Sequence, residues 1–216
     1  MNRKTAYQVL ISGGKGTGKS TLADLLMRSH RRSFVFDLMG EYPAKGFSVA
    51  RSHADVLRLV KAGWRRGFRI AYVPSGGDKR VELSNFAELI CKIQRPYFDT
   101  PDGSTPPIPK VLLTVEEMRW SYPNGTQEPG FATICTLGRH YGIDVIGTTQ
   151  RIAEVSTNFR GTSDVQFFFA QHDHTDHSTI AKMIGRRHVP ALQSLKPHEY
   201  LRVFRGQVER GRNRLK

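Results

Sequence analysis

The sequence is poor in cysteine and has no long apolar run. Its two cysteines, Cys91 and Cys135, stand far apart and outside any CxxC pattern, which argues against a disulfide framework and indicates a reducing compartment. No run approaches the ~18 apolar residues of a membrane-spanning helix, and the apolar run after the basic start is too short for a signal peptide. We therefore expect a soluble, cytoplasmic protein without a transmembrane segment.

Acidic residues are scarce. The chain has 19 Asp and Glu against 33 Lys and Arg, which gives a formal net charge of +14 over 216 residues. Such an excess favours polyanionic partners, of which nucleic acid is the commonest. An anionic membrane surface, or a basic protein without a polyanionic partner, remains an alternative at this point.

Internal repeats are also lacking, and what the chain has instead is an alternation of apolar runs and helical patterns. Apolar runs predict strands at 7–12, 33–37, 68–74, 110–115, 143–149 and 165–170, with a terminal strand or hairpin at 200–208. Helical spacing predicts helices at 21–30, 52–66, 84–94, 130–141 and 176–184.

This alternation predicts an α/β fold with a mainly parallel sheet flanked by helices on both faces. We expect a single domain over residues 1–204, followed by a basic C-terminal tail at 205–216. The proline-rich stretch 96–110 is expected to be a loop within that domain, because predicted core strands lie on both sides of it.

A glycine-rich run matches the phosphate-loop pattern G-x-x-x-x-G-K-S/T. Glycines allow the backbone to curl around phosphate, and the positive end of the following helix adds to the attraction. In this pattern Lys19 contacts the β- and γ-phosphates and Ser20 binds Mg²⁺. A chance glycine-rich turn is the alternative, but a buried strand precedes the run and an amphipathic helix follows it. The sequence therefore predicts a P-loop NTPase that binds ATP and Mg²⁺ through Gly13, Gly14, Lys15, Gly16, Thr17, Gly18, Lys19, Ser20 and Thr21.

Two adjacent carboxylates, Glu116 and Glu117, follow the apolar strand at 110–115. A carboxylate at the tip of a buried strand is costly unless it has a cationic partner, and Mg²⁺ beside Ser20 supplies one. We expect Glu116 to hold Mg²⁺ through water and Glu117 to polarise the attacking water. The alternative is a helix start with acidic residues that suit the helix dipole.

Polar side chains near the ends of later strands are further candidates. Gln150 ends the strand at 143–149, where an amide can sense the γ-phosphate. An arginine finger could come from Arg139, Arg151 or Arg160, all expected near the nucleotide edge of the sheet, with Arg139 favoured first and Arg160 second. In so basic a chain, each of these arginines can equally be a surface charge.

A cluster of histidines and aspartates has ligand types that suit Zn²⁺. It falls where a strand passes into a helix, so helix capping by Asp176 or Ser178 is the favoured interpretation. The residues concerned are His172, Asp173, His174, Asp176 and His177.

Taken in order, the motifs resemble those of the HerA–FtsK superfamily of DNA-pumping ATPases. The segment FVFDLMGEY matches the family pattern Asp-x-x-Gly-Glu-Tyr, the acidic motif is Glu-Glu, and GRHYGIDVIGTTQR ends in Thr-Gln-Arg. These features are closer to the HerA branch. The resemblance implies a ring, usually of six subunits, with ATP between neighbours and double-stranded DNA through the centre. It supports the roles of Lys19, Ser20, Glu116, Glu117 and Gln150, supports Arg139 as the finger, and places Asp37 and Glu41 near the nucleotide.

The chain departs from the cellular members of this family. HerA-type helicases carry an N-terminal barrel and FtsK-type pumps carry membrane and DNA-orienting domains, and because the phosphate loop begins at residue 13 we expect neither here. A core of this size is similar to the genome-packaging ATPases of membrane-containing viruses. This similarity implies a double-stranded DNA translocase in the host cytoplasm or virion, with capsid or portal-vertex proteins as partners. A cellular HerA-like translocase in DNA end processing and a P-loop small-molecule kinase are the alternatives.

Overall fold

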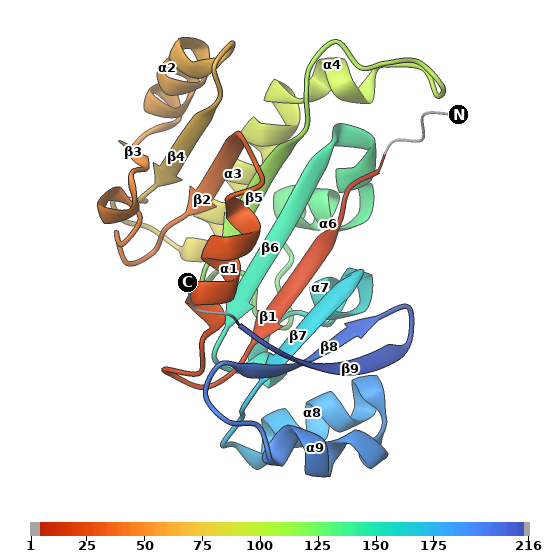
Figure 1. The fold of residues 1–216 in the computed structure, drawn as a ribbon. Coiled ribbons are helices and arrows are strands. Elements are labelled where there is room, and N and C mark those ends of the chain that lie inside the picture. Colours follow the sequence, from red (N-terminus) through yellow and green to blue (C-terminus); the bar gives the residue numbers. More distant parts are fainter. Residues whose placement is uncertain (1–4, 214–216) are drawn as a thin grey trace.

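The protein, described here over residues 5–213 in a computed structural model, is built on one nine-stranded sheet (Figure 1). The strand order is β3-β4-β2-β5-β6-β1-β7-β8-β9. Strands β1 to β7 run parallel to one another, and β8 and β9 are antiparallel additions at one end of the sheet. The carboxyl ends of the parallel strands therefore lie along one edge, which we call the carboxyl edge, and their amino ends lie along the opposite, amino edge.

The elements alternate as the sequence predicts. The strands are β1 Gln8–Ser12, β2 Arg32–Phe36, β3 Ser48–Ala50, β4 Phe68–Tyr72, β5 Val111–Val115, β6 Ile143–Thr149, β7 Val165–Phe169, β8 Glu199–Phe204 and β9 Gln207–Arg212. The α-helices are α1 Lys19–Met27, α2 His53–Gly63, α3 Lys79–Ile93, α4 Arg95–Phe98, α5 Met118–Ser121, α6 Pro129–Tyr141, α7 Thr157–Thr162, α8 His174–Ile184 and α9 Val189–Gln193. Short 3-10 turns lie at η1 Pro43–Lys45, η2 Ile152–Glu154 and η3 Arg186–His188.

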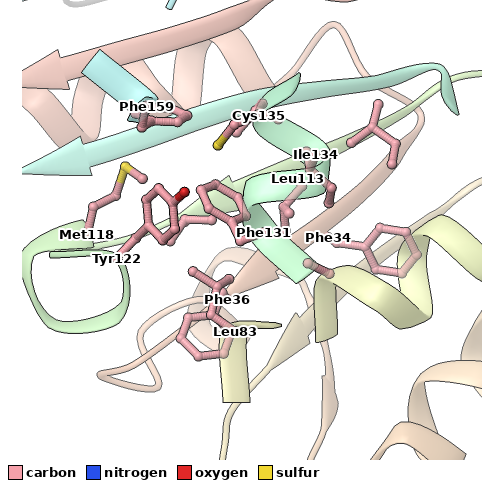
Figure 2. Close-up of a cluster of buried hydrophobic side chains, with 14 of the residues drawn as sticks. Phe34, Phe36, Leu83, Leu113, Met118, Tyr122, Phe131, Ile134, Cys135 and Phe159 are labelled. Atoms are coloured by element: carbon pink, nitrogen blue, oxygen red, sulfur yellow. The ribbon is translucent and has the colours of Figure 1, made fainter. Parts of the chain in front are cut away.

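Both faces of the sheet are buried. Alternate residues of a strand point to opposite faces, so Leu10 packs in one hydrophobic cluster and its neighbour Ile11 in the other. The smaller cluster lies beneath α1. The larger one packs α3 and α6 against the sheet, and in Figure 2 Phe131 of α6 lies beside Tyr122, with their ring centroids 4.9 Å apart. The predicted α/β fold with helices on both faces of a mainly parallel sheet is confirmed.

The C-terminal segment differs from the prediction of a basic tail at 205–216. Residues 207–212 form β9, which pairs along its whole length with β8 and extends the sheet. Most residues of β9 are exposed, as expected of the last strand at one end of a sheet. The end of the predicted tail, 214–216, lies outside the described residues.

The sequence also missed several short elements. The proline-rich stretch expected to be a loop begins with one helical turn, α4, because Pro96 is tolerated in the first turn of a helix. The elements β3, α5, α7 and α9 have six residues or fewer, too few to show a periodic pattern. No helix within residues 5–213 is long and apolar enough to span a membrane.

Candidate nucleotide-binding site

The phosphate loop lies at the carboxyl edge, between β1 and α1. Its start is fastened to two neighbouring strands, because the Gly13 amide donates to the Thr149 carbonyl at 3.2 Å and the Gly14 amide to the Ala170 carbonyl at 2.9 Å. A Cβ on Gly13 would come within 2.5 Å of the Phe169 Cβ, so only glycine fits there. Gly18, the residue before α1, has φ 106°, a conformation that favours glycine. The sequence pattern is therefore folded as a phosphate-binding loop.

Lys19 points back into this loop and is only 8% exposed. Its Nζ donates to the Gly14 carbonyl at 2.9 Å, and Thr17 Oγ1 donates to the same oxygen at 2.8 Å. Burial lowers the pKa of Lys19, and the nearby carboxylates of Glu117 and Glu116 oppose that effect. The ammonium group is thus held at the loop with little water around it, where an incoming phosphate would interact with it strongly.

Glu116 is buried at the carboxyl end of β5, with 9% of its surface exposed. The Tyr42 hydroxyl donates to its Oε1 at 2.8 Å. Burial raises the pKa of Glu116 to about 7, although the hydrogen bond from Tyr42 lowers it. A buried carboxyl group with this raised pKa is one that a neighbouring cation would stabilise in its charged form.

Tyr42 is positioned by a tight turn after β2. The two carboxylate oxygens of Asp37 accept hydrogen bonds from the amides of Gly40, Glu41 and Tyr42, at 2.8 to 3.1 Å. Asp37 is fully buried, so these three donors stabilise its charge. The Asp-x-x-Gly-Glu-Tyr motif thus forms a turn that brings its tyrosine to Glu116. The motif was recognised in the sequence, but this contact joins residues 74 positions apart and was not predicted.

Glu117 and Gln150 are hydrogen-bonded to each other. The Gln150 amide Nε2 donates to Glu117 Oε1 at 2.9 Å. Glu117 has φ 43°, a left-handed conformation that costs a non-glycine residue roughly 1–3 kcal/mol and that concentrates at functional sites. Gln150, expected to sense the γ-phosphate, therefore also orients the neighbouring carboxylate.

One cavity of about 480 Å³ joins these residues. It brings together Lys19, Ser20, Glu116, Glu117 and Gln150, as the sequence predicts, with Glu41 at its wall. Arg119 and Trp120 also line it and were missed, although they directly follow the Glu-Glu pair. The Arg119 guanidinium lies 4.7 Å from the Trp120 ring centroid, and its Nε is 3.9 Å from Glu117 Oε2. The full lining is Lys15, Gly16, Lys19, Ser20, Met39, Glu41, Glu116, Glu117, Arg119, Trp120, Thr148 and Gln150.

The three candidate arginine fingers lie in different surroundings. Arg139 is exposed in the last turn of α6, just before β6 begins, and so lies at the amino edge rather than at the expected nucleotide edge. Arg151 is at the carboxyl edge, but it forms ion pairs with Asp176 at 2.8 Å and Asp173 at 3.1 Å. Arg160 Nε donates to a backbone carbonyl at 3.0 Å, and burial lowers the pKa of Arg160. None of the three lines the cavity of its own chain within the described residues.

The two aspartates of the histidine–aspartate cluster make structural contacts in this fold. Asp173, not Asp176 or Ser178, caps α8, accepting from the Thr175 amide at 2.8 Å. Asp176 is buried and accepts from the Ala153 amide in addition to pairing with Arg151. Among residues 5–213, no group of three His, Cys, Asp or Glu side chains is arranged to hold a metal ion.

The C-terminal segment contacts the phosphate loop, which the sequence did not indicate. Asn213 Nδ2 donates to the Gly18 carbonyl at 2.9 Å, and the His198 amide donates to the Thr17 carbonyl at 2.9 Å. The Asn213 amide in turn donates to the His198 carbonyl at 2.9 Å. Asn213 is 6% exposed, so its side chain is a fixed support for the loop.

Substitution of Asn213 by aspartate is expected to weaken ATP binding about tenfold, because it replaces the donor to the Gly18 carbonyl with a carboxylate that can only accept, and two oxygen atoms then face each other at the phosphate loop. The measurement is titration with a fluorescent ATP analogue. Asn124→Asp is the matched control, since Asn124 Nδ2 also donates to a carbonyl at 2.9 Å, but away from the cavity. Equal affinity of Asn213→Asp and the wild-type protein, at unchanged melting temperature, would show that this contact does not shape the loop.

The fold and the phosphate loop are those of a P-loop NTPase. Among solved structures, the chain is similar to the genome-packaging NTPase B204 from Sulfolobus turreted icosahedral virus 2 in complex with AMPPCP, with a TM-score of 0.76 and 17% identity over 98% of this chain and 99% of that one. It is similarly related to B204, the DNA-packaging ATPase from Sulfolobus turreted icosahedral virus, with a TM-score of 0.76 and 16% identity over the whole of both chains.

EssC (ATPases 2 and 3) from Geobacillus thermodenitrificans has a TM-score of 0.59 at 17% identity, over 92% of this chain and 38% of that one. No protein-family model matches the chain, and no curated protein sequence matches it. The likeness to these solved structures confirms the predicted fold, an α/β P-loop NTPase fold with a mainly parallel sheet.

Proposed function

We propose that this protein is an ATPase that moves double-stranded DNA, and that its role is to package a viral genome. The observation that carries the proposal is the cavity that joins the phosphate loop to Glu116, Glu117 and Gln150. The similar B204 structures, which hold AMPPCP or ATP-γ-S, support nucleotide binding at such a loop.

In this proposal the phosphate loop binds the triphosphate through its amides and through Lys19. Glu117 accepts the proton of the attacking water, and its carboxylate is oriented by the Gln150 amide. The Gln150 side chain donates to one carboxylate oxygen of Glu117 at 2.9 Å and the Gln150 backbone amide donates to the other at 3.4 Å, so Gln150 fixes the orientation of the group that would accept the proton. Loss of the γ-phosphate would change the surroundings of Gln150, which fits its expected role as a sensor.

The site also fits Mg²⁺. Oxygen ligands suit this ion, and the Ser20 hydroxyl and the Glu116 carboxylate line the same cavity. The Tyr42 hydroxyl donates to Glu116, and burial raises the pKa of Glu116 to about 7, so a bound cation would stabilise the charged form of this carboxylate. When bound, Mg²⁺ would neutralise charge on the phosphates. Ser20 and Glu116 would hold it, with Tyr42 fixing the orientation of the carboxylate.

The proposal of DNA as the second ligand rests on two supports. The net charge of +14 favours a polyanion, and one similar structure is of a DNA-packaging ATPase. We further propose a homo-oligomeric ring of six subunits with ATP between neighbours, acting with capsid or portal-vertex proteins in the host cytoplasm or virion.

The test of the function is ATP hydrolysis with and without double-stranded DNA. A DNA motor should hydrolyse ATP faster when duplex DNA is added, and no phosphate acceptor should be needed. A rate of ATP hydrolysis that does not change when DNA is added, or phosphate transfer to an added small-molecule acceptor, would favour the kinase alternative and contradict the proposed motor function.

Arg139→Ala is expected to spare ATP binding and to lower turnover, by about tenfold to a hundredfold, because an arginine finger acts mainly on the transition state. The side chain is exposed and far from the phosphate loop of its own chain, as a finger for a neighbouring subunit would be. The test mixes Arg139→Ala with Glu117→Gln chains, since some sites then pair an intact Glu117 with a neighbour's intact Arg139.

Partial recovery of activity is expected in that mixture. The control mixes Lys19→Ala with Glu117→Gln, where both defects affect the same half of the site and no recovery is expected. If the Arg139→Ala mixture fails to recover at every ratio, Arg139 acts within its own chain or is only a surface charge.

A further inference from the structure

Unpaired arginines gather at the amino edge, on the side of the sheet opposite the phosphate loop. They come from the end of α1, the start of β2 and the link from α2 to β4, segments that the sheet brings together because Arg32 of β2 pairs in register with Phe68 of β4. Figure 1 shows α2 at the top of the view, whereas the carboxyl ends of β1 and β6 point downward. The exposed members are Arg28, Arg31, Arg65, Arg66 and Arg69.

Three of these arginines surround a hollow of about 560 Å³, which we call the arginine hollow. The Arg31 guanidinium is held over the α2–β4 link, since its Nη2 donates to the Arg66 carbonyl at 3.4 Å. The Arg69 guanidinium rests 4.3 Å from the centroid of the Phe47 ring. Two of the three charged groups are thus fixed by contacts to the fold. The lining is Arg31, Gly46, Ser48, Leu59, Ala62, Gly63, Arg66, Gly67, Phe68, Arg69 and Ile70.

The arginine hollow has no internal counter-ion. Its lining contains no carboxylate, and none of its three arginines forms an ion pair with another described residue. Asp144, which also lies at the amino edge, is already paired with His30 at 3.3 Å and Lys110 at 3.0 Å. Positive charge concentrated without compensation attracts an anion from outside the chain.

The chemistry of the arginine hollow favours phosphate groups. Guanidinium groups bind phosphate oxygens in a bidentate manner, and arginine is more weakly hydrated than lysine, so it recognises phosphodiesters well. A Cβ at Gly46 would have no other atom within 4 Å, so this part of the wall is open to an approaching ligand. The nucleotide cavity lies at the other edge of the sheet, so ATP bound there cannot supply this anion.

We propose that the arginine hollow binds the phosphate backbone of double-stranded DNA. The inference rests on the proposed function for the choice of DNA among phosphate-bearing ligands. Exposed Arg65, in the link from α2 to β4, continues the positive surface beyond the hollow, so several phosphates of a duplex can be contacted along this edge. Such contacts read the backbone and not the bases, as a motor moving along any sequence requires.

The test compares the wild-type protein with the triple variant Arg31→Gln, Arg66→Gln, Arg69→Gln. The matched control is Arg80→Gln, Arg95→Gln, Arg202→Gln, which removes the same charge from arginines that are already paired with Asp78, Asp99 and Glu209. A third variant, with lysine at 31, 66 and 69, keeps the charge but loses the bidentate geometry. Binding of two unrelated duplexes of equal length is measured by fluorescence anisotropy across salt concentration.

The wild-type protein should bind both duplexes equally, and its affinity should fall steeply between about 50 and 200 mM salt. The glutamine variant should reduce the log–log salt slope by about three and lower affinity tenfold or more, since each lost phosphate contact removes about 0.9 from the slope. The lysine variant should retain most of the slope. Equal losses in the glutamine variant and its matched control would overturn the inference, because net charge alone would then explain binding.

A second arm tests another phosphate-bearing surface. The glutamine variant should bind phosphatidylserine vesicles as the wild-type protein does, or neither should bind them. Loss of vesicle binding with duplex binding intact would overturn the proposal and assign the hollow to a membrane. DNA-free ATP hydrolysis should be unchanged in the variant. Absent hydrolysis in the wild-type protein would contradict the proposed function while leaving the binding result interpretable.

Discussion

Replacement of Lys19 by alanine is expected to abolish ATP hydrolysis. The Lys19 ammonium group is buried in the phosphate loop, 2.9 Å from the Gly14 carbonyl, and in the variant only backbone amides remain to hold the γ-phosphate. ATP affinity should fall by roughly tenfold to a hundredfold, because hydrogen bonds to charged groups contribute about 1.5–3 kcal/mol. Phosphate release and titration with a fluorescent ATP analogue measure the two effects.

Lys92→Ala provides the matched control, since Lys92 is an exposed lysine of α3 outside the nucleotide cavity. It should hydrolyse ATP at the wild-type rate. Wild-type turnover in Lys19→Ala itself would refute the assignment of the phosphate loop.

Glu117→Gln is expected to bind ATP normally and to lower hydrolysis by about 10²–10⁴-fold, the range for loss of a general base. The amide keeps the size of the side chain and can still offer an oxygen to Gln150, but it cannot accept a proton from water. Single-turnover hydrolysis with bound ATP isolates this step from binding.

Glu116→Gln distinguishes the roles of the two carboxylates. It should weaken Mg²⁺ affinity, so that hydrolysis requires more Mg²⁺, because Glu116 is the proposed metal ligand, and it should keep the hydrogen bond from Tyr42. A stall of hydrolysis in Glu116→Gln at unchanged Mg²⁺ affinity, with Glu117→Gln active, would reverse the two roles.

The parts of the site that are local in the chain could be predicted from the sequence. The phosphate loop is a continuous motif between a strand and a helix, so its glycines and Lys19 identify it without knowledge of the rest of the fold. Glu116, Glu117 and Gln150 were predicted because they follow apolar strands, and parallel strands bring their carboxyl ends to one edge. The structure places all three in the same cavity.

The parts that depend on distant pairing could not be predicted. The Tyr42–Glu116 and Asn213–Gly18 hydrogen bonds span 74 and 195 residues, and no local pattern indicates them. The basic segment at 207–212 reads as a tail by its charge, yet its pairing with β8 makes it a strand. The expectation that Arg139 lies at the nucleotide edge was wrong, and here the sequence order was sufficient to correct it, because a residue that precedes β6 adjoins the amino end of that strand.

The ion pairs of buried charges could not be predicted from the sequence either. Arg151 follows the Thr-Gln pair at the nucleotide edge, and from sequence it was a candidate finger. In the fold it neutralises Asp176, which is 1% exposed on α8, so its charge serves the packing of two elements. The arginine hollow likewise exists only because β2 and β4 pair, which brings Arg31 beside Arg66, 35 positions away in the chain.

The central claim is ATP-driven movement along double-stranded DNA, and triplex displacement tests it most directly. A third strand bound to a duplex should be released when the protein and ATP are added, and release should stop with a non-hydrolysable analogue or in Glu117→Gln, which binds ATP but stalls its chemistry. Hydrolysis of ATP in the presence of that duplex without any release of the third strand would contradict the account.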